Sequence, residues 1–201
     1  MRAGVQSRER LSIKVSPRKP DSLVARNQRS RVSRNLESNP VEITFTIPHL
    51  FAPGVSPREN AEGLRVLLDA LIAVNCWYLR SHSARPLYRS GVSYARTDDW
   101  ECIPALYASG WHGTNQQGSR HPAKHGVFGD CKSLTAAYVA EQYMSGVECK
   151  PVFRFSPMPG GEQMFHILVW VLPSAANPKG RWEDPSAKLG MGRDELAWFG
   201  L

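Results

Sequence analysis

Three residues in the second half of the sequence have types and an order suited to nucleophilic chemistry. The first is Cys131, in residues 129–133 (GDCKS), where a polar stretch passes into a segment with helical periodicity. At a helix start, unpaired backbone N–H groups and the positive end of the dipole stabilise a thiolate. With Lys132 as a neighbouring cation, we expect the pKa of Cys131 to lie below the ordinary value of about 8.5. The same N–H groups can bind the oxyanion that forms when sulfur attacks a carbonyl.

A cysteine nucleophile also needs a base and a group that orients the base. His166 lies in residues 165–171 (FHILVWV), an apolar run with no other ionisable group, where an imidazole without a partner is costly to bury. Asp184 comes at the end of the next expected strand and can hold the other ring nitrogen. We therefore predict Cys131 as nucleophile, His166 as base and Asp184 as the orienting carboxylate.

Two further assignments stay open. Besides the Cys131 amide, the oxyanion needs a side-chain donor, and the upstream candidates are Trp100, Gln116 and Gln117. The competing reading is a metal site drawn from His112, His121, His125 and Cys131. Their spacings match no zinc pattern, so we predict neither a metal nor a cofactor.

Two helices are expected to position these groups. Residues 57–81 follow the N-cap Ser56, with Pro57 at the first helical position and Glu59 placed to close a capping box. Leucines at spacings of three and four give this helix one apolar face. The second helix is expected over residues 131–145, so that Cys131 opens it.

Strands are expected over residues 41–48, where polar and β-branched apolar residues alternate, and within residues 150–184. The second range holds three runs, ending with 181–184, and predicts a sheet that carries His166 and Asp184. Residues 86–104 show no regular period, and residues 109–126 are polar. We expect neither of these two segments to contribute to the core.

The charge of the protein is concentrated at one end. The chain of 201 residues has a formal net charge of +7, and residues 1–39 hold ten Lys and Arg against three Asp and Glu. Residues 40–201 are therefore neutral. Residues 1–40 are also poor in large apolar side chains, so we expect a basic extended arm without structure of its own, followed by one domain over residues 41–201. Such an arm docks on a partner, contacts nucleic acid weakly, or serves only solubility.

Cellular location is constrained by what the sequence lacks. No run of about 18 apolar residues is present, and the basic N-terminal stretch has no apolar core of a secretory signal. The four cysteines are scattered and form no CxxC pair. These features predict a protein without a membrane segment, not secreted, in a reducing compartment.

Several stretches together resemble the small transglutaminase-like proteins of tailed bacteriophages, within the papain-like superfamily. They are residues 87–92 (LYRSGV), 129–131 (GDC), the run with His166, and 183–191 (EDPSAKLGM), and the similarity covers roughly residues 60–192. The resemblance implies an α+β fold in which a helix with the catalytic cysteine at its N-terminus packs on an antiparallel sheet. It also implies a Cys–His–Asp triad at Cys131, His166 and Asp184. Two features depart from the family, the polar insertion at residues 111–126 and Lys132 in place of an acidic residue.

This reading predicts a cysteine-nucleophile acyl-transfer enzyme of phage origin, acting as a cysteine protease, a deamidase or a Gln–Lys cross-linking enzyme. Its partner is then a protein substrate. The alternative is a phage virion or assembly protein that keeps the fold as a structural, binding module and holds other phage structural proteins through residues 1–48. The two readings place the protein in the host cytoplasm or the virion.

Overall fold

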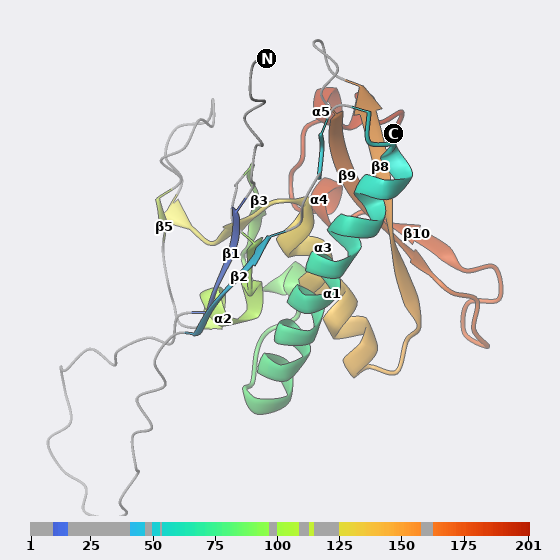
Figure 1. The fold of residues 1–201 in the computed structure, drawn as a ribbon. Helices are drawn as coiled ribbons and strands as arrows, with labels where there is room; N and C mark the ends of the chain where they lie inside the picture. Colours follow the sequence, from blue (N-terminus) through green and yellow to red (C-terminus); the bar gives the residue numbers. More distant parts are fainter. Residues whose placement is uncertain are drawn as a thin grey trace, which may run out of the picture.

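The computed structural model describes residues 10–15, 41–46, 50–52, 54–96, 100–108, 113–114, 125–157 and 163–201. These residues form a mixed α+β fold (Figure 1). Most of the polar segment 109–126 lies outside the described residues. The exceptions are the paired strands β5 (Gly113–Thr114) and β6 (His125–Gly126).

Helix α1 spans Pro57–Ser81, which coincides with the expected range. Its capping box is complete, because the Ser56 side chain accepts from the Glu59 amide and the Glu59 carboxylate accepts from the Ser56 amide at 2.9 Å. Four leucines of its apolar face are buried, with Leu68 and Leu71 fully enclosed, whereas Leu79 is partly buried. This face packs against helix α3 (Cys131–Met144).

Helix α3 is the central element of the core. It contacts α1 on one side and the strands β8 (Cys149–Pro157) and β9 (Gln163–Val171) on the other. Residues 133–140 are all buried, which explains the small side chains Ala136, Ala137 and Ala140 in this stretch. The chain leaves α3 through Gly146, whose φ of 72° is the left-handed conformation that favours glycine.

An antiparallel sheet covers α3, in the strand order β10-β9-β8. Strand β10 (Arg181–Glu183) pairs with the end of β9, with Glu183 opposite Val169. The three strands occupy the range 150–184 expected from the sequence, except that β8 begins one residue earlier. Two short helices that the sequence did not predict follow, α4 (Pro185–Lys188) and α5 (Arg193–Ala197).

A second sheet includes part of the N-terminal arm. Strand β1 (Arg10–Val15) lies within the stretch expected to have no structure, and it pairs antiparallel with β2 (Val41–Thr46). On its other side β1 pairs in parallel with β4 (Trp100–Glu101). The expectation was therefore wrong for these six residues, while residues 1–9, 16–40 and 47–49 lie outside the described residues. Strand β2, the strand expected at the start of the domain, pairs with a strand of its own chain.

The segment between α1 and α3 was also misjudged, because it contributes to the core. It forms the 3₁₀ helix η1 (Leu87–Arg89), β3 (Ser93–Tyr94) and α2 (Ile103–Ala108), and β3 pairs in parallel with β7 (Phe128–Gly129). The buried side chains of this segment include Leu87, Val92, Trp100, Cys102 and Ile103. Elements of two to six residues are too short to show a hydrophobic period, so only tertiary packing reveals their burial.

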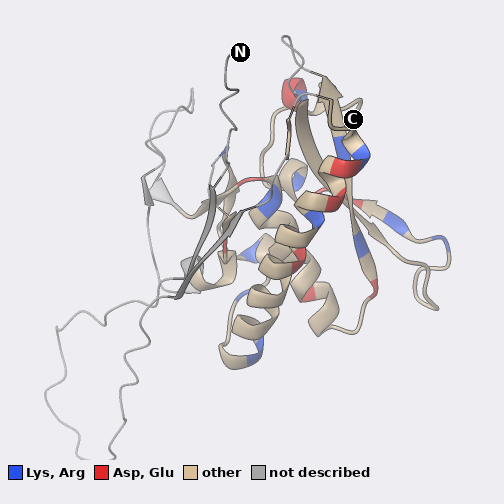
Figure 2. Ribbon diagram, viewed as in Figure 1, with Lys and Arg blue, Asp and Glu red and all other residues tan. Residues whose placement is uncertain are grey.

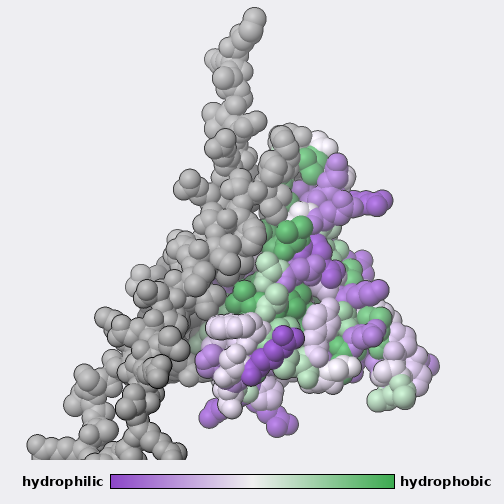
Figure 3. All heavy atoms as spheres, turned by 60° about the horizontal axis from the view of Figure 1, so that its bottom comes forward, coloured by the Kyte–Doolittle hydropathy of each residue, from purple (hydrophilic) through white to green (hydrophobic). Residues whose placement is uncertain are grey.

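The described surface is mixed in charge and polarity. Lys and Arg are scattered among Asp and Glu over the described part of the chain (Figure 2), as expected for a neutral body. On the face shown in Figure 3, small hydrophobic patches are interspersed among hydrophilic residues. Among the described residues, no helix has the length and apolar character needed to cross a membrane.

Candidate active site

Cys131 is the first residue of α3, as the sequence predicted, and Asp130 caps the helix. The Asp130 carboxylate accepts hydrogen bonds from the amides of Lys132 at 3.0 Å and Ser133 at 3.3 Å. Gly129 precedes the cap where a Cβ atom would lie 2.8 Å from Ile103 Cδ1 and 3.0 Å from Leu134. A side chain at this position would push on the core, so glycine lets the loop approach the helix closely.

The surroundings of Cys131 do not lower its pKa, contrary to the prediction from its helix position. The thiol is buried, and burial raises its pKa to about 12, with a further increase from the Asp130 carboxylate. Lys132 and a backbone hydrogen bond from Ile167 act in the opposite direction but are outweighed. Cys131 is therefore a neutral thiol in this conformation.

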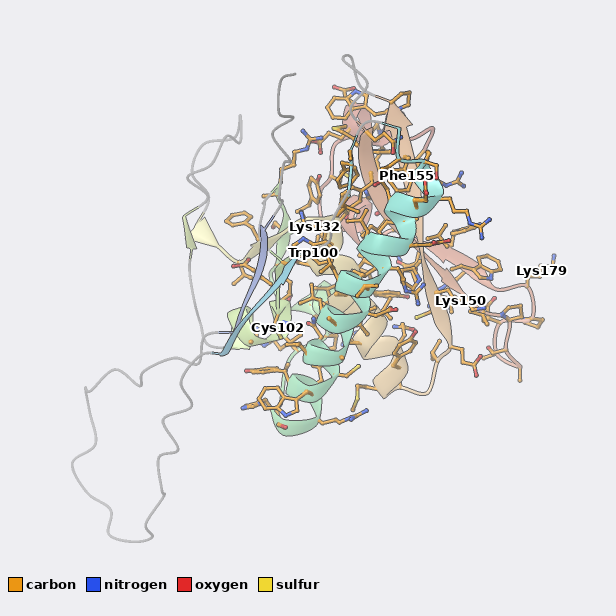
Figure 4. All side chains as sticks on the ribbon, in the orientation of Figure 1. Trp100, Cys102, Lys132, Lys150, Phe155 and Lys179 are labelled. Carbon is orange, nitrogen blue, oxygen red and sulfur yellow. The ribbon has the colours of Figure 1, made fainter. Side chains whose placement is uncertain are left out.

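Lys132, predicted to activate the nucleophile, is engaged elsewhere. Its ammonium pairs with the buried carboxylate of Asp130 and lies 5.8 Å from the centre of the Trp100 ring (Figure 4). Burial raises the pKa of Asp130, and the ion pair with Lys132 opposes that effect. The main electrostatic role of Lys132 is thus to neutralise the capping carboxylate.

His166 and Asp184 are brought together by the sheet and the turn that follows it. Nε2 of His166 lies 2.9 Å from Oδ2 of Asp184. Because β10 pairs with β9 and ends at Glu183, the next residue is delivered beside His166. Asp184 is also the N-cap of α4, with Oδ1 accepting from the Ala187 amide at 3.0 Å and Pro185 at the first helical position.

Cys131 approaches this pair from the side of α3. The Ile167 backbone hydrogen-bonds to the sulfur, and the Asp184 carboxylate contributes to the raised pKa of the thiol, so both lie within interaction range. His166 is fully buried, and within the described residues its Nδ1 atom has no hydrogen-bond partner. A buried ring nitrogen without a partner is rare, and it is often explained by a functional role.

Residues at the end of the described chain cover the histidine. The Phe199 ring lies 5.4 Å from the His166 ring, centre to centre. Arg96 contacts the same segment, with its Nε 3.3 Å from Glu195 and its guanidinium 5.2 Å from the Trp198 ring. Cys131 and His166 are 8% and 0% exposed, so the site is closed to a large substrate in this conformation.

A charged network behind Asp184 was not predicted from the sequence. Glu183 is buried, and it accepts a hydrogen bond from the Tyr88 hydroxyl at 2.8 Å and pairs with Lys188. Arg181 Nε lies 3.6 Å from the same carboxylate. The network ties β10, α4 and η1 together and fixes the position of the turn that carries Asp184. A glutamate next to the candidate Asp184 was the available signal in the sequence.

The other residues predicted for the site lie in the core or outside the described part of the chain. Trp100 is 1% exposed and lies in the core, which leaves its indole little access to an incoming substrate. Gln116 and Gln117 lie outside the described residues, as do His112 and His121 of the metal alternative. Within the described part of the chain, no group of three or more His, Cys, Asp and Glu side chains is placed to hold a metal ion.

The sequence matches no protein-family model, and it has no significant match among curated proteins or solved structures. A thiol at a helix start and an imidazole held by a carboxylate are two of the groups that nucleophilic catalysis by cysteine requires.

Proposed function

We propose that the protein is a cysteine-nucleophile acyl-transfer enzyme with a transglutaminase-like core, in which Cys131 is the nucleophile, His166 the base and Asp184 the group that orients the base. One observation carries the proposal. The fully buried His166 has Nε2 fixed by Asp184 at 2.9 Å, and its Nδ1 has no partner among the described residues. The backbone of the next strand residue, Ile167, hydrogen-bonds to Cys131. A base of this kind needs one nitrogen held and the other available.

The raised pKa of Cys131 determines when the thiol proton is transferred to His166. Because the resting thiol is neutral, His166 takes the proton as the sulfur attacks the carbonyl carbon of the acyl donor. The C–S bond forms while the carbonyl π electrons move to oxygen. When the tetrahedral intermediate collapses, the C–N bond breaks, and the leaving amine takes the proton from the imidazolium. The product on the enzyme is a thioester of Cys131.

The second half of the reaction sets the outcome. His166 removes a proton from water or a lysine amine as that group attacks the thioester, and then returns the proton to the Cys131 sulfur. Water gives peptide or isopeptide hydrolysis, or deamidation of glutamine, whereas lysine gives a Gln–Lys cross-link. The acceptor depends on how far water is excluded from the closed site.

The proposal is tested with p-nitrophenyl acetate, a small acyl donor suited to a closed site. We expect a burst of p-nitrophenol equal to one equivalent per chain, its absence in Cys131→Ala, and acylation at least about 100-fold slower in His166→Ala. Cys76→Ala is the matched control, since Cys76 is also a buried free thiol but lies on α1. Acylation of Cys131 that is no faster than that of free cysteine and is insensitive to His166 would contradict the proposal.

The alternative, a phage virion or assembly protein that uses the fold as a binding module, is favoured by one observation. In the sheet order β2-β1-β4, strand β2 is an edge strand, and an edge can accept a strand from a partner. This alternative requires no chemistry at Cys131. A folded protein without the acylation burst would favour it over the enzyme.

A further inference from the structure

Tyr94 lies between the two chain segments that carry the candidate site. It stands opposite Gly129 in the parallel pair of β3 and β7, and the next amide, that of Ala95, donates to the Gly129 carbonyl at 3.0 Å. The Tyr94 amide donates to the Leu189 carbonyl at 2.7 Å, just after α4. Strand β3 thus joins the loop before Cys131 to the helix that follows Asp184.

The side chain of Tyr94 belongs to the same packed region as the nucleophile. It is half-buried and packs against the core cluster that includes Cys131. Burial raises the pKa of the phenol, and the largest contribution from a neighbouring group comes from Cys131, ahead of Glu195 and Asp130. Tyr94 therefore keeps its proton at neutral pH. Its hydroxyl makes no hydrogen bond to another described residue, so within the described part of the chain it is available as a donor.

We propose that Tyr94 donates a hydrogen bond to the oxyanion of the tetrahedral intermediate formed on Cys131. The inference rests on the proposed acyl-transfer function. The carbonyl oxygen of a bound acyl group is attached to the carbon that bonds to sulfur, so a donor close to the sulfur can reach it. A neutral O–H group is suited to this role because it stabilises the negative charge without competing for the proton that His166 holds.

The other predicted oxyanion donors are either enclosed in the core or outside the described residues. The Trp100 side chain is enclosed in the core with its ring below Lys132, and the glutamines at 116 and 117 lie outside the described residues. Tyr94 combines a hydroxyl that is not engaged by another described residue with a backbone position opposite Gly129, two residues before Cys131. The sequence contained little signal for it, because a two-residue strand shows no periodicity.

The test compares two reactions of the same thiol in Tyr94→Phe. Acylation by p-nitrophenyl acetate passes through an oxyanion, whereas alkylation by iodoacetamide is a displacement at carbon that forms none. We expect the second-order rate constant of acylation to fall by about 100-fold, the usual effect of losing one oxyanion donor, while the rate of alkylation stays the same. Tyr143→Phe is the matched control, because Tyr143 lies near the far end of α3.

Each outcome decides between explanations. An equal loss in both reactions would show that Tyr94 affects the thiol or the fold, and it would overturn the assignment of Tyr94 as oxyanion donor. An unchanged rate of acylation would also overturn it, leaving the triad intact. If the unmodified protein shows no acylation that depends on His166, the proposed function itself fails, and the role of Tyr94 with it.

Discussion

Asp184 holds His166 with one carboxylate oxygen while the other caps a helix. Its Oδ2 lies 2.9 Å from Nε2 of His166, and its Oδ1 accepts from the Ala187 amide. The cap restricts the carboxylate, because rotation toward another partner would release an amide of α4. Asp130 has a similar double role beside Cys131, capping α3 while it pairs with Lys132. Both candidate site residues thus lie beside aspartates that are fixed at helix starts.

The two roles of Asp184 can be separated by substitution. Asn caps a helix about as well as Asp, so Asp184→Asn should leave the free energy of unfolding nearly unchanged, whereas Asp184→Ala should lower it by about 1 kcal/mol. An asparagine amide can donate to Nε2, which places the proton of neutral His166 on Nδ1 and leaves no lone pair for the thiol. We expect acylation by p-nitrophenyl acetate to fall about 10³- to 10⁴-fold in both variants. Equal acylation rates in Asp184→Asn and the unmodified protein would exclude this role.

The pair of Asp130 and Lys132 is predicted to serve stability. Lys132→Ala leaves a buried carboxylate without its cation and should lower the free energy of unfolding by about 3 kcal/mol at pH 8, as measured in urea. The loss should be smaller at pH 5, because the raised pKa of Asp130 allows the uncompensated carboxyl to take a proton. The double variant Asp130→Asn, Lys132→Met removes both charges and keeps a capping side chain, so most of the stability should return. Additive losses in the double variant would contradict a direct pairing.

The parts of the fold that could be predicted are the elements whose hydrophobic pattern extends over many residues. Helix α1 has seven turns and a capping box, and strand β9 has an apolar run, so local pattern and tertiary burial agree. Strand β1 shows why the arm was misjudged. Its sequence RLSIKV alternates Leu11, Ile13 and Val15 with polar residues, a strand signal that was hidden in a basic stretch.

The sequence nominates the residues of the candidate site but does not predict their electrostatics. The types and order of Cys131, His166 and Asp184 are visible in the sequence, whereas the contact between His166 and Asp184 depends on the pairing of β10 with β9. The pKa of Cys131 depends on how deeply the thiol is buried, which a helix start alone does not reveal. The effect of burial on the pKa of the thiol outweighs that of the helix N-terminus, and the positive charge of Lys132 is neutralised by its ion pair with Asp130.

The contact between Phe199 and His166 predicts how access to the site is controlled. An aromatic pair contributes about 0.5–1.5 kcal/mol. Phe199→Ala should therefore increase the population of an open form, in which the segment around residue 199 has moved away from His166, by about 2- to 10-fold. We expect iodoacetamide to alkylate Cys131 faster by that factor, as followed by mass spectrometry of the intact protein. Leu201→Ala is the matched control, because Leu201 is 48% exposed and two residues away. An unchanged rate in Phe199→Ala would show that this ring does not limit access.

Glu141 on α3 is predicted to make stability depend on pH. Burial raises the pKa of this carboxyl from 4.5 to about 7, although its Oε1 accepts a hydrogen bond from the Leu87 amide at 2.6 Å. Between these two pH values the folded protein holds a proton that the unfolded chain has released, so the free energy of unfolding falls as the pH rises from about 4.5 to 7. Glu141→Gln keeps an acceptor for Leu87 and does not titrate. We therefore expect its Tm to exceed that of the unmodified protein at pH 8 by a few degrees, about 2–4 °C for each kcal/mol, with a smaller difference at pH 5. A Tm difference that is the same at both pH values would show that Glu141 does not titrate in this range.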